Sequence, residues 1–304
     1  MQHLKVRGGP DGLYLFDRDT GINILLDEIE VPQSHWAIAP RQVSIALTNV
    51  CDLYCSYCYA PKHVSKLSVN RLADWLDELD SNGTVGVGFG GGEPTLYPQL
   101  AEICQYAAQR TGLAVSFTTH AHHLDIRLAR KLKGNVHFLR VSMDGIGNTY
   151  ETMRGKSFQT LIKQLDYVRE IAPFGINFVV NAKTIHDLDN AVVIAHNEGA
   201  AEFLLLPERS VLGKGGIDIE TIHTLRAWVL AYHGPIRIST SDAHAEDFPI
   251  CNPFSKELGL CAYAHIDADG VLKRSSYDLD GIPIRSGSVI EAVRFLREQP
   301  GGQL

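Results

Sequence analysis

Three cysteines lie close together in the segment Cys51-Asp52-Leu53-Tyr54-Cys55-Ser56-Tyr57-Cys58. Their spacing is C-x3-C-x2-C, and no fourth cysteine is near. Three thiolates on one compact loop can hold three irons of a cubane [4Fe–4S] cluster. The fourth iron then lacks a protein ligand and accepts a small molecule, and such an open position is typical of catalytic metal sites.

Two other interpretations of the triplet are weaker. Structural zinc usually uses two spaced pairs of ligands, which are absent here. Buried free cysteines are common, but three within eight residues of a loop are not. The remaining cysteines, Cys104, Cys251 and Cys261, do not indicate a disulfide framework in a cytosolic chain of this size.

From residue 42 onward, short apolar strands alternate with amphipathic helices. Six such units predict a parallel sheet with helices outside it, and so an α/β fold, a partial (β/α)6 TIM barrel or a doubly wound sheet, of which we favour the barrel. In either fold, ligands gather at the carboxyl ends of the strands. The cysteine triplet directly follows the first predicted strand. The predicted strands are 43–47, 85–89, 115–118, 138–143, 176–180 and 203–206.

The two flanks of this repeat have a different pattern. Residues 1–40 contain two apolar runs around Asp17–Gly21, which predict an N-terminal β-hairpin extension. Residues 41–235 are the predicted barrel domain. Residues 236–304 contain a second hairpin signal, Ala268-Asp269-Gly270, followed by a predicted helix over 289–297.

Composition and charge exclude several classes of function. The chain has 304 residues and a formal net charge of −7, which argues against broad nucleic-acid binding. No run of 18 apolar residues is present, so no membrane span is expected. Met1–Lys5 lack the apolar core of a signal peptide, so we expect a cytoplasmic protein.

The triplet, with Tyr57 before its last cysteine, resembles the signature of the radical S-adenosylmethionine (SAM) superfamily. The resemblance implies one [4Fe–4S] cluster, whose open iron SAM chelates through its amino and carboxylate groups. It also implies that an electron reaching the cluster cleaves SAM to a 5′-deoxyadenosyl radical, which abstracts a substrate hydrogen. An electron donor such as flavodoxin or ferredoxin is the implied partner.

The segment Gly91-Gly92-Glu93-Pro94, after the second predicted strand, looks like the family's Gly-Gly-Glu-Pro motif. Glycines let the backbone approach a ligand closely, and a carboxylate is a natural partner for the SAM ammonium. Gly86–Gly91 also matches G-x-G-x-x-G. We reject a dinucleotide loop because the glycines begin inside the strand and Glu93-Pro94 stands where a helix should open.

Further strand ends carry residues that the resemblance assigns to SAM. Ser142 would bond SAM and Arg154 would pair with its carboxylate, against the alternative of a surface arginine and a turn. By strand position, Asn181 would touch the ribose or carboxylate. Leu206 or its neighbour would line the adenine slot or pack in the core, and Thr118 begins the segment that touches the ribose.

The segment after the third strand, Thr118–His123, departs from the family's Thr-Asn-Gly. His120 takes the Asn position, and we interpret it as a pocket-lining acid or base. A second metal at the three histidines is disfavoured, because neither the spacing nor nearby carboxylates support it. The predicted catalytic residues, polar groups expected at the open mouth, are His120, Glu208, Lys183 and Asp144.

The C-terminal segment from Cys261 through Gly270 to Ser275 resembles the SPASM/twitch extension of radical SAM maturases. Ser275 stands where that extension has a second cysteine, and an alkoxide is a poor iron ligand. We therefore expect the hairpin without an auxiliary cluster. Whether Cys251 and Cys261 contribute to a second cluster stays open.

Three functions follow from these patterns. The twitch-like tail and the N-terminal hairpin favour a radical SAM enzyme that modifies a peptide or protein. The compact size favours a small-molecule or nucleotide substrate instead. The third is an iron–sulfur sensor or binding protein without turnover.

Overall fold

The computed structural model describes residues 4–211, 215–241, 248–284 and 287–299. Its centre is a ten-stranded sheet of order β10-β9-β8-β7-β6-β5-β4-β11-β12-β13. All neighbours from β10 to β11 pair in parallel, and β12 (Val271–Lys273) and β13 (Ile282–Pro283) add antiparallel strands. The parallel strands are β4 (Gln42–Thr48), β5 (Gly86–Gly91), β6 (Ala114–Thr119), β7 (Phe138–Ser142), β8 (Phe174–Val180), β9 (Glu202–Pro207), β10 (Arg237–Thr240) and β11 (Tyr263–Ile266).

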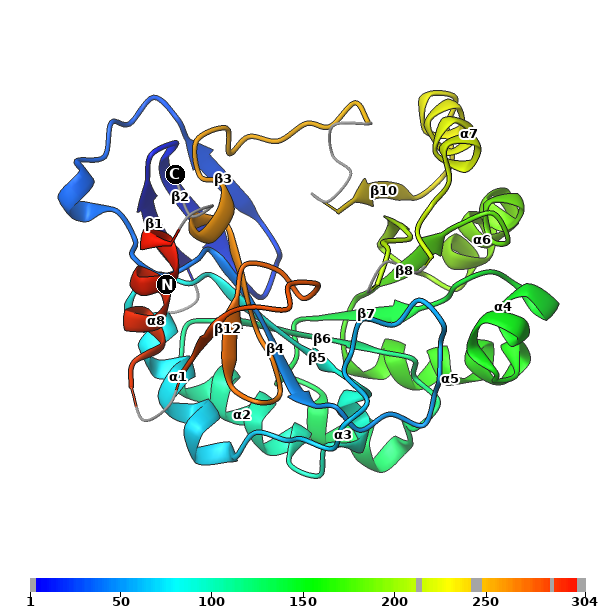
Figure 1. Cartoon of the computed structure of the whole chain (residues 1–304), viewed down its shortest axis with the longest axis horizontal. Helices are drawn as coiled ribbons and strands as arrows, with labels where there is room; N and C mark the ends of the chain where they lie inside the picture. Colours follow the sequence, from blue (N-terminus) through cyan, green and yellow to red (C-terminus); the bar gives the residue numbers. More distant parts are fainter. Residues whose placement is uncertain (1–3, 212–214, 242–247, 285–286, 300–304) are drawn as a thin grey trace.

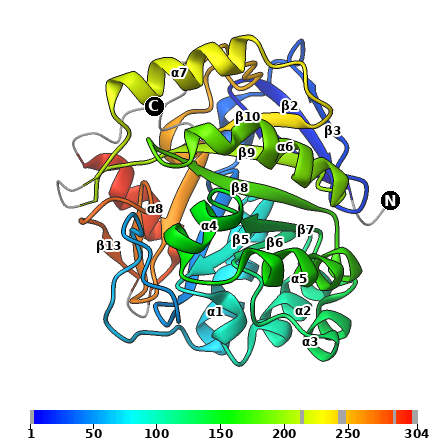
Figure 2. The same ribbon diagram turned by 90° about the vertical axis from the view of Figure 1, so that its right-hand side faces the viewer.

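Helices α1, α2, α3 and α5 line the outer side of this sheet (Figure 1), and Figure 2 shows α6 and α7 beyond β9 and β10. Within the described ranges the sheet does not close, since β10 and β13 form its edges. The predicted α/β fold with an open partial barrel is confirmed. The helices are α1 (Val69–Ser81), α2 (Leu100–Arg110), α3 (Ile126–Leu132), α4 (Gly147–Arg154), α5 (Phe158–Ile171), α6 (Leu188–Asn197), α7 (Ile219–Leu230) and α8 (Val289–Glu298).

The hydrophobic pattern explains how these elements pack. Helix α1 buries Leu72, Trp75, Leu76 and Leu79, an i, i+3, i+4, i+7 stripe that faces the sheet. In the barrel strands, alternate side chains enter the core beneath the helices, whereas the others face the interior of the barrel. The interior-facing positions are polar, glycine or half-buried, and they are available to line a site.

Three of the α-helices and strands that the structure describes were not predicted from the sequence: α4, β1 (Leu4–Gly9) and the two-residue strand β13 (Ile282–Pro283). Helix α4 is short and largely polar, so it gave no clear apolar period. Strand β1 pairs with β2 (Gly12–Asp17), which pairs with β3 (Asn23–Leu26), so the predicted hairpin is a three-stranded antiparallel sheet. Strand β1 was not recognised because its apolar residues, Leu4 and Val6, are exposed, whereas its cationic residues, Lys5 and Arg7, face inward.

Arg7 anchors the three-stranded sheet to the barrel. Its side chain is 3% exposed and lies 2.9 Å from the Glu257 carboxylate. The guanidinium donates to the carbonyls of Ala39, Gly83 and Cys261 at 3.0, 2.7 and 3.1 Å. One buried arginine thus connects β1, the loop before β5 and the C-terminal segment.

The C-terminal segment shares the barrel sheet. Strand β11 pairs in parallel with β4, and β12 (Val271–Lys273) returns antiparallel to form the predicted hairpin before β13 (Ile282–Pro283) and α8. The domain boundaries at 40/41 and 235/236 stay a prediction. In the part of the chain that the structure describes, no helix combines the length and apolarity needed to cross a membrane.

Candidate functional site

The three clustered cysteines lie on the loop between β4 and α1. All three are free and half-buried. The Leu53 amide donates to the Cys51 sulfur at 3.4 Å, and the Cys58 amide donates to the Cys55 carbonyl at 3.1 Å. Burial raises the pKa of the Cys51 thiol, whose proton a metal would displace.

Two glycines at the end of β5 hold this loop against the sheet. Gly91 has a φ of +111°, and a Cβ there would lie 2.2 Å from the Thr48 carbonyl oxygen. A Cβ on Gly92 would lie 2.3 Å from the Val50 carbonyl oxygen. The close approach permits two hydrogen bonds, from Gly92 to Thr48 at 2.7 Å and from Glu93 to Val50 at 2.9 Å. Gly90, by contrast, faces open space.

Glu93 is buried at this junction, with 1% of its surface exposed. Its Oε1 accepts from the Thr95 amide at 3.0 Å and from the hydroxyls of Thr95 and Thr119 at 2.6 Å each. Its Oε2 accepts from the His120 amide at 2.9 Å. Oε1 therefore has three donors, and Oε2 has the His120 amide as donor with His120 Nε2 a further 3.3 Å contact.

Asp144 is fully buried, although the sequence placed it among polar groups at the open mouth. It accepts from the Tyr57 hydroxyl at 2.5 Å and from the Val179 amide at 2.7 Å, and it pairs with Arg154. Burial, then the Asp144 carboxylate, raises the pKa of Tyr57. Arg154 thus has a partner within the chain, while its buried Nε has none among the described residues.

The interior face of the barrel near this carboxylate combines polar and apolar groups. Ser142 lies opposite Asn177 in the β7–β8 register, and Thr118 faces the interior from β6. Leu206 faces it from β9, opposite Val179, and is half-buried. The buried Oδ1 of Asn177 has no hydrogen-bond partner in the described part of the chain, and such a buried acceptor usually requires one.

Asn177 was missed by the sequence analysis. The available signal was a polar residue between Ile176 and Phe178, at an interior-facing position of an apolar strand.

Asn181 and Glu208 lie together beyond the ends of β8 and β9. The Asn181 amide donates to Glu208 at 2.7 Å, and its oxygen accepts from the amides of Lys183 and Thr184 at 2.9 and 3.1 Å. Both ends of Asn181 are therefore engaged. Lys183 points its exposed side chain outward, as a rim residue would.

His120 lies between two carboxylates from different strand ends. Its Nε2 is 3.0 Å from Asp52 and 3.3 Å from Glu93. Asp52 also contacts His123 at 3.1 Å and Lys156 at 2.8 Å. Burial lowers the pKa of His120 despite these anions. His120 therefore connects the cysteine loop to Glu93.

The sequence analysis found no carboxylate near the histidines, whereas the fold brings Asp52 and Glu93 to His120. Ligand atoms of Cys51, Asp52 and His120 lie within 4.8 Å of one another. Cys51 belongs to the cysteine triplet as well, so this trio overlaps the cluster site.

A cluster of aromatic residues lies beside the cysteine loop. Tyr277, from the loop after β12, packs under the Arg209 guanidinium at 4.5 Å and lies 5.1 Å from the Tyr59 ring. The Ser44 hydroxyl lies 2.6 Å from both the Tyr263 hydroxyl and His265 Nδ1. These residues could not be predicted from the sequence, because the β4–β11 pairing that brings Ser44 beside Tyr263 and His265 joins segments far apart in the chain.

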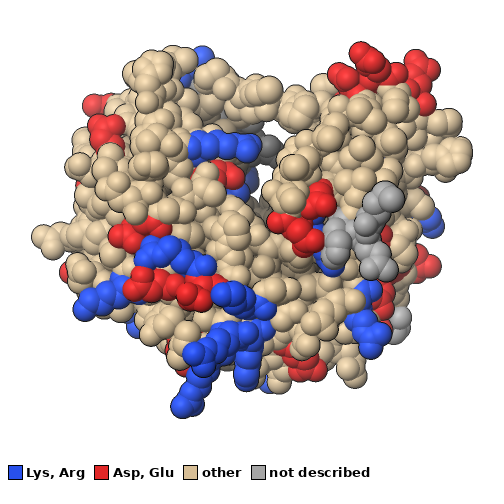
Figure 3. Space-filling model, turned by 180° about the vertical axis from the view of Figure 1, so that it is seen from behind, with Lys and Arg blue, Asp and Glu red and all other residues tan. Residues whose placement is uncertain are grey.

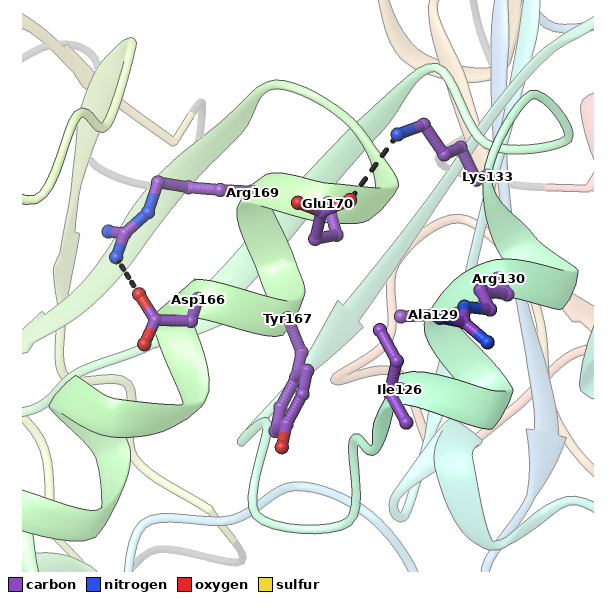
Figure 4. A pocket seen from close by; sticks show the side chains of 8 residues that line it. All are labelled: Ile126, Ala129, Arg130, Lys133, Asp166, Tyr167, Arg169 and Glu170. Carbon is purple, nitrogen blue, oxygen red and sulfur yellow. Dashed lines mark hydrogen bonds and ion pairs between the residues drawn. The ribbon is translucent and has the colours of Figure 1, made fainter.

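A shallow groove of about 770 Å³ lies away from this site, between α3 and α5 (Figure 4). Lys133 pairs there with Glu170 at 3.3 Å, and Arg169 pairs with Asp166. On the face seen from behind, Figure 3 shows Lys and Arg side chains gathered beside Asp and Glu side chains. The groove belongs to the outer helical layer and does not reach the strand ends.

Residues 45–192, which include the cysteine loop and strands β5 to β8, match the radical SAM superfamily. The chain carries a radical SAM domain. It is 30% identical over 150 residues to Fe-coproporphyrin III synthase of Methanosarcina barkeri, covering 47% of this chain and 37% of that protein. It is 26% identical over 222 residues to the mycofactocin maturase MftC of Mycobacterium ulcerans, covering 70% and 58%. The chain thus spans about half the length of the curated relatives it matches.

The fold has a solved counterpart over nearly its whole length. Streptococcus suis SuiB bound to S-adenosylmethionine superposes with a TM-score of 0.78 at 14% identity, covering 98% of this chain and 90% of that one. At this identity the likeness establishes the fold alone. It extends beyond the radical SAM domain to both flanking segments.

The family's cofactors are a [4Fe–4S] cluster and SAM, and the site fits them. Three free thiols on one anchored loop match a cluster with an open iron. Gly90 faces open space, and the Asn177 oxygen has no partner among the described residues, so both leave room for a ligand.

Proposed function

We propose that this chain is a radical SAM enzyme that modifies a peptide. Cys51, Cys55 and Cys58 would hold the cluster, and SAM would lie along the ends of β5 to β9. When bound, these groups supply reductive cleavage of SAM to a 5′-deoxyadenosyl radical that abstracts a substrate hydrogen. The observation that carries the proposal is the cysteine loop pinned by Gly91 and Gly92.

The chain's own residues would bind and orient SAM. Glu93 Oε2 would accept a hydrogen bond from the SAM ammonium, while the donors to its other oxygen hold the carboxylate in place. Arg154 has free donors for the SAM carboxylate beyond those used by Asp144. Ser142, Thr118 and Asn177 would offer polar groups to the ribose from the barrel interior.

His120, Asn181, Glu208 and Leu206 complete the proposed pocket. His120 would act as a positioning residue, because its ring contacts two carboxylates rather than open space. Asn181 fixes Glu208 at the rim, and Leu206 offers an apolar surface to adenine. Lys183 would contact substrate from outside, and Asp144 would act through Arg154 and Tyr57.

A peptide substrate is supported by the coverage of the comparisons. MftC is named a maturase, and SuiB has been solved bound to its precursor peptide SuiA, a structure that superposes over 96% of this chain. A flavodoxin or ferredoxin would supply the electron, in the cytoplasm.

The test is anaerobic reconstitution followed by SAM and dithionite. We expect 5′-deoxyadenosine from the wild-type protein and none from Cys55→Ala. Absence of product from a fully loaded, reduced wild-type protein would favour the cluster-bearing sensor instead. Peptides encoded beside the gene are then added, and a mass change in a peptide, rather than in a small metabolite, supports the substrate class.

A further inference from the structure

The outer surface of the cysteine loop exposes large apolar side chains beside lysines. We define the cluster-loop surface as Val50, Tyr54, Lys62, Val64 and Lys66. Tyr54 and Val64 are each 85% exposed, and Val50 is 41% exposed. Lys62 lies 6.0 Å above the Tyr54 ring. Exposed apolar side chains rimmed by polar ones are typical of protein interaction sites.

This exposure belongs to a loop that is held in place. The Asn49 amide donates to the Ser65 carbonyl at 3.0 Å, which fixes both ends of the loop. The Ser65 hydroxyl donates to the Ala268 carbonyl at 2.8 Å, and His63 lies 2.7 Å from Asp269. The β11–β12 turn therefore holds the cysteine loop in place through these contacts, so the exposed side chains of the loop have a defined position.

The charge of the loop is opposite to that of the chain. Residues 53–69 contain Lys62 and Lys66 and no Asp or Glu, in a protein of formal net charge −7. Neither lysine forms an ion pair with any residue that the structure describes. In the α3–α5 groove, Lys133 and Arg169 have acidic partners, whereas Arg130 has none among the described residues. The loop thus offers an acidic partner unpaired positive charge on a protein of net negative charge.

We propose that the cluster-loop surface is the docking site for an acidic one-electron carrier protein. The inference rests on the proposed function, which requires an external electron. Tyr54 lies between Cys51 and Cys55 in the chain, so a partner seated on it contacts the loop that carries all three cysteines. One electron passes from the carrier, which is oxidised, to the cluster, which is reduced, and no bond or proton is transferred. Tyr54 and Val64 supply the apolar contact, and the lysines supply orientation and association rate.

The test separates docking from catalysis. The reconstituted full chain is assayed for 5′-deoxyadenosine with dithionite and, separately, with flavodoxin reduced by NADPH and its reductase. For the double variant Lys62→Glu, Lys66→Glu we expect an unchanged dithionite rate and a flavodoxin rate reduced at least about tenfold at low salt. The wild-type flavodoxin rate should fall as salt rises.

The matched control reverses two cations of α3, Arg130→Glu and Lys131→Glu, which changes net charge equally. It should retain the wild-type flavodoxin rate. The proposal would be overturned if both double variants lost flavodoxin-driven activity equally, or if the loop variant lost none. It would also be overturned if the loop variant lost its dithionite-driven activity. Calorimetric titration with oxidised flavodoxin measures docking without turnover. The titration therefore tests the docking proposal even if the wild-type protein cleaves no SAM. Absence of SAM cleavage would reject the proposed function and not the docking proposal.

Discussion

Adding one methyl group at Gly91 should release the cysteine loop. The Cβ of Gly91→Ala would lie 2.2 Å from the Thr48 carbonyl oxygen, at a φ of +111°. An alanine in left-handed backbone costs roughly 1–2 kcal/mol. The displacement would also break the hydrogen bonds from Gly92 to Thr48 and from Glu93 to Val50, each contributing about 1 kcal/mol.

We therefore expect Gly91→Ala to lose roughly 3–4 kcal/mol of folding stability. Anaerobic urea denaturation of the cluster-free protein measures this loss, and iron and sulfide content after reconstitution measures cluster loading, which should fall with it. Gly90→Ala is the matched control, because its methyl group meets nothing within 4 Å. It should fold and bind iron normally. A Gly91→Ala protein as stable and as fully loaded as wild type would refute the reasoning.

Three further predictions concern buried charges. Asp144→Asn leaves the Arg154 guanidinium without its counter-ion and should cost about 3–5 kcal/mol of stability in urea denaturation. Arg7→Met should destabilise by a similar, roughly 3–5 kcal/mol amount, because the buried Glu257 carboxylate keeps only the longer contact with Arg41 at 3.9 Å, and should make β1–β3 sensitive to limited proteolysis. Burial lowers the pKa of His265 to about 4, so its ring is neutral in the folded protein. As the pH falls, the unfolded chain is protonated at this histidine before the folded protein is. Folding stability should therefore fall as the pH is lowered from 6.5 to 4, and it should fall less in His265→Gln, as measured by denaturation across that range.

The sequence was a good guide to the strands and to the residues following them. Runs such as 43–47 and 203–206 are short and mostly apolar because alternate side chains of these parallel strands enter the core beneath the helices, and this pattern is readable without a structure. The cysteine triplet and Gly91–Glu93 are local motifs, so their position next to strand ends could be inferred from order along the chain alone.

The contacts between distant segments could not be predicted. Asp52 reaches His120, and Tyr277 reaches Arg209, only because separate strand ends meet at one edge of the sheet. Asp144 was expected at the mouth because it follows a strand, yet its pairing with Arg154 and Tyr57 draws it inside. A sequence gives residue type and spacing, whereas such pairings depend on the register of β7 with β8.

One feature of the third strand end explains a departure from the family pattern. Ala121 adopts a φ of +65° and is fully buried, at the position where the family's Thr-Asn-Gly has glycine. Alanine tolerates this conformation at a cost of roughly 1–2 kcal/mol. The turn that places His120 against Asp52 and Glu93 is therefore retained despite the change in residue type.

The most direct test of the central claim is electron paramagnetic resonance of the reduced, reconstituted protein with and without SAM. A cluster held by Cys51, Cys55 and Cys58 has an iron free for SAM, so adding SAM should alter the spectrum of the [4Fe–4S]⁺ state. A spectrum identical in the presence and absence of SAM, or no cubane spectrum at all, would contradict the account.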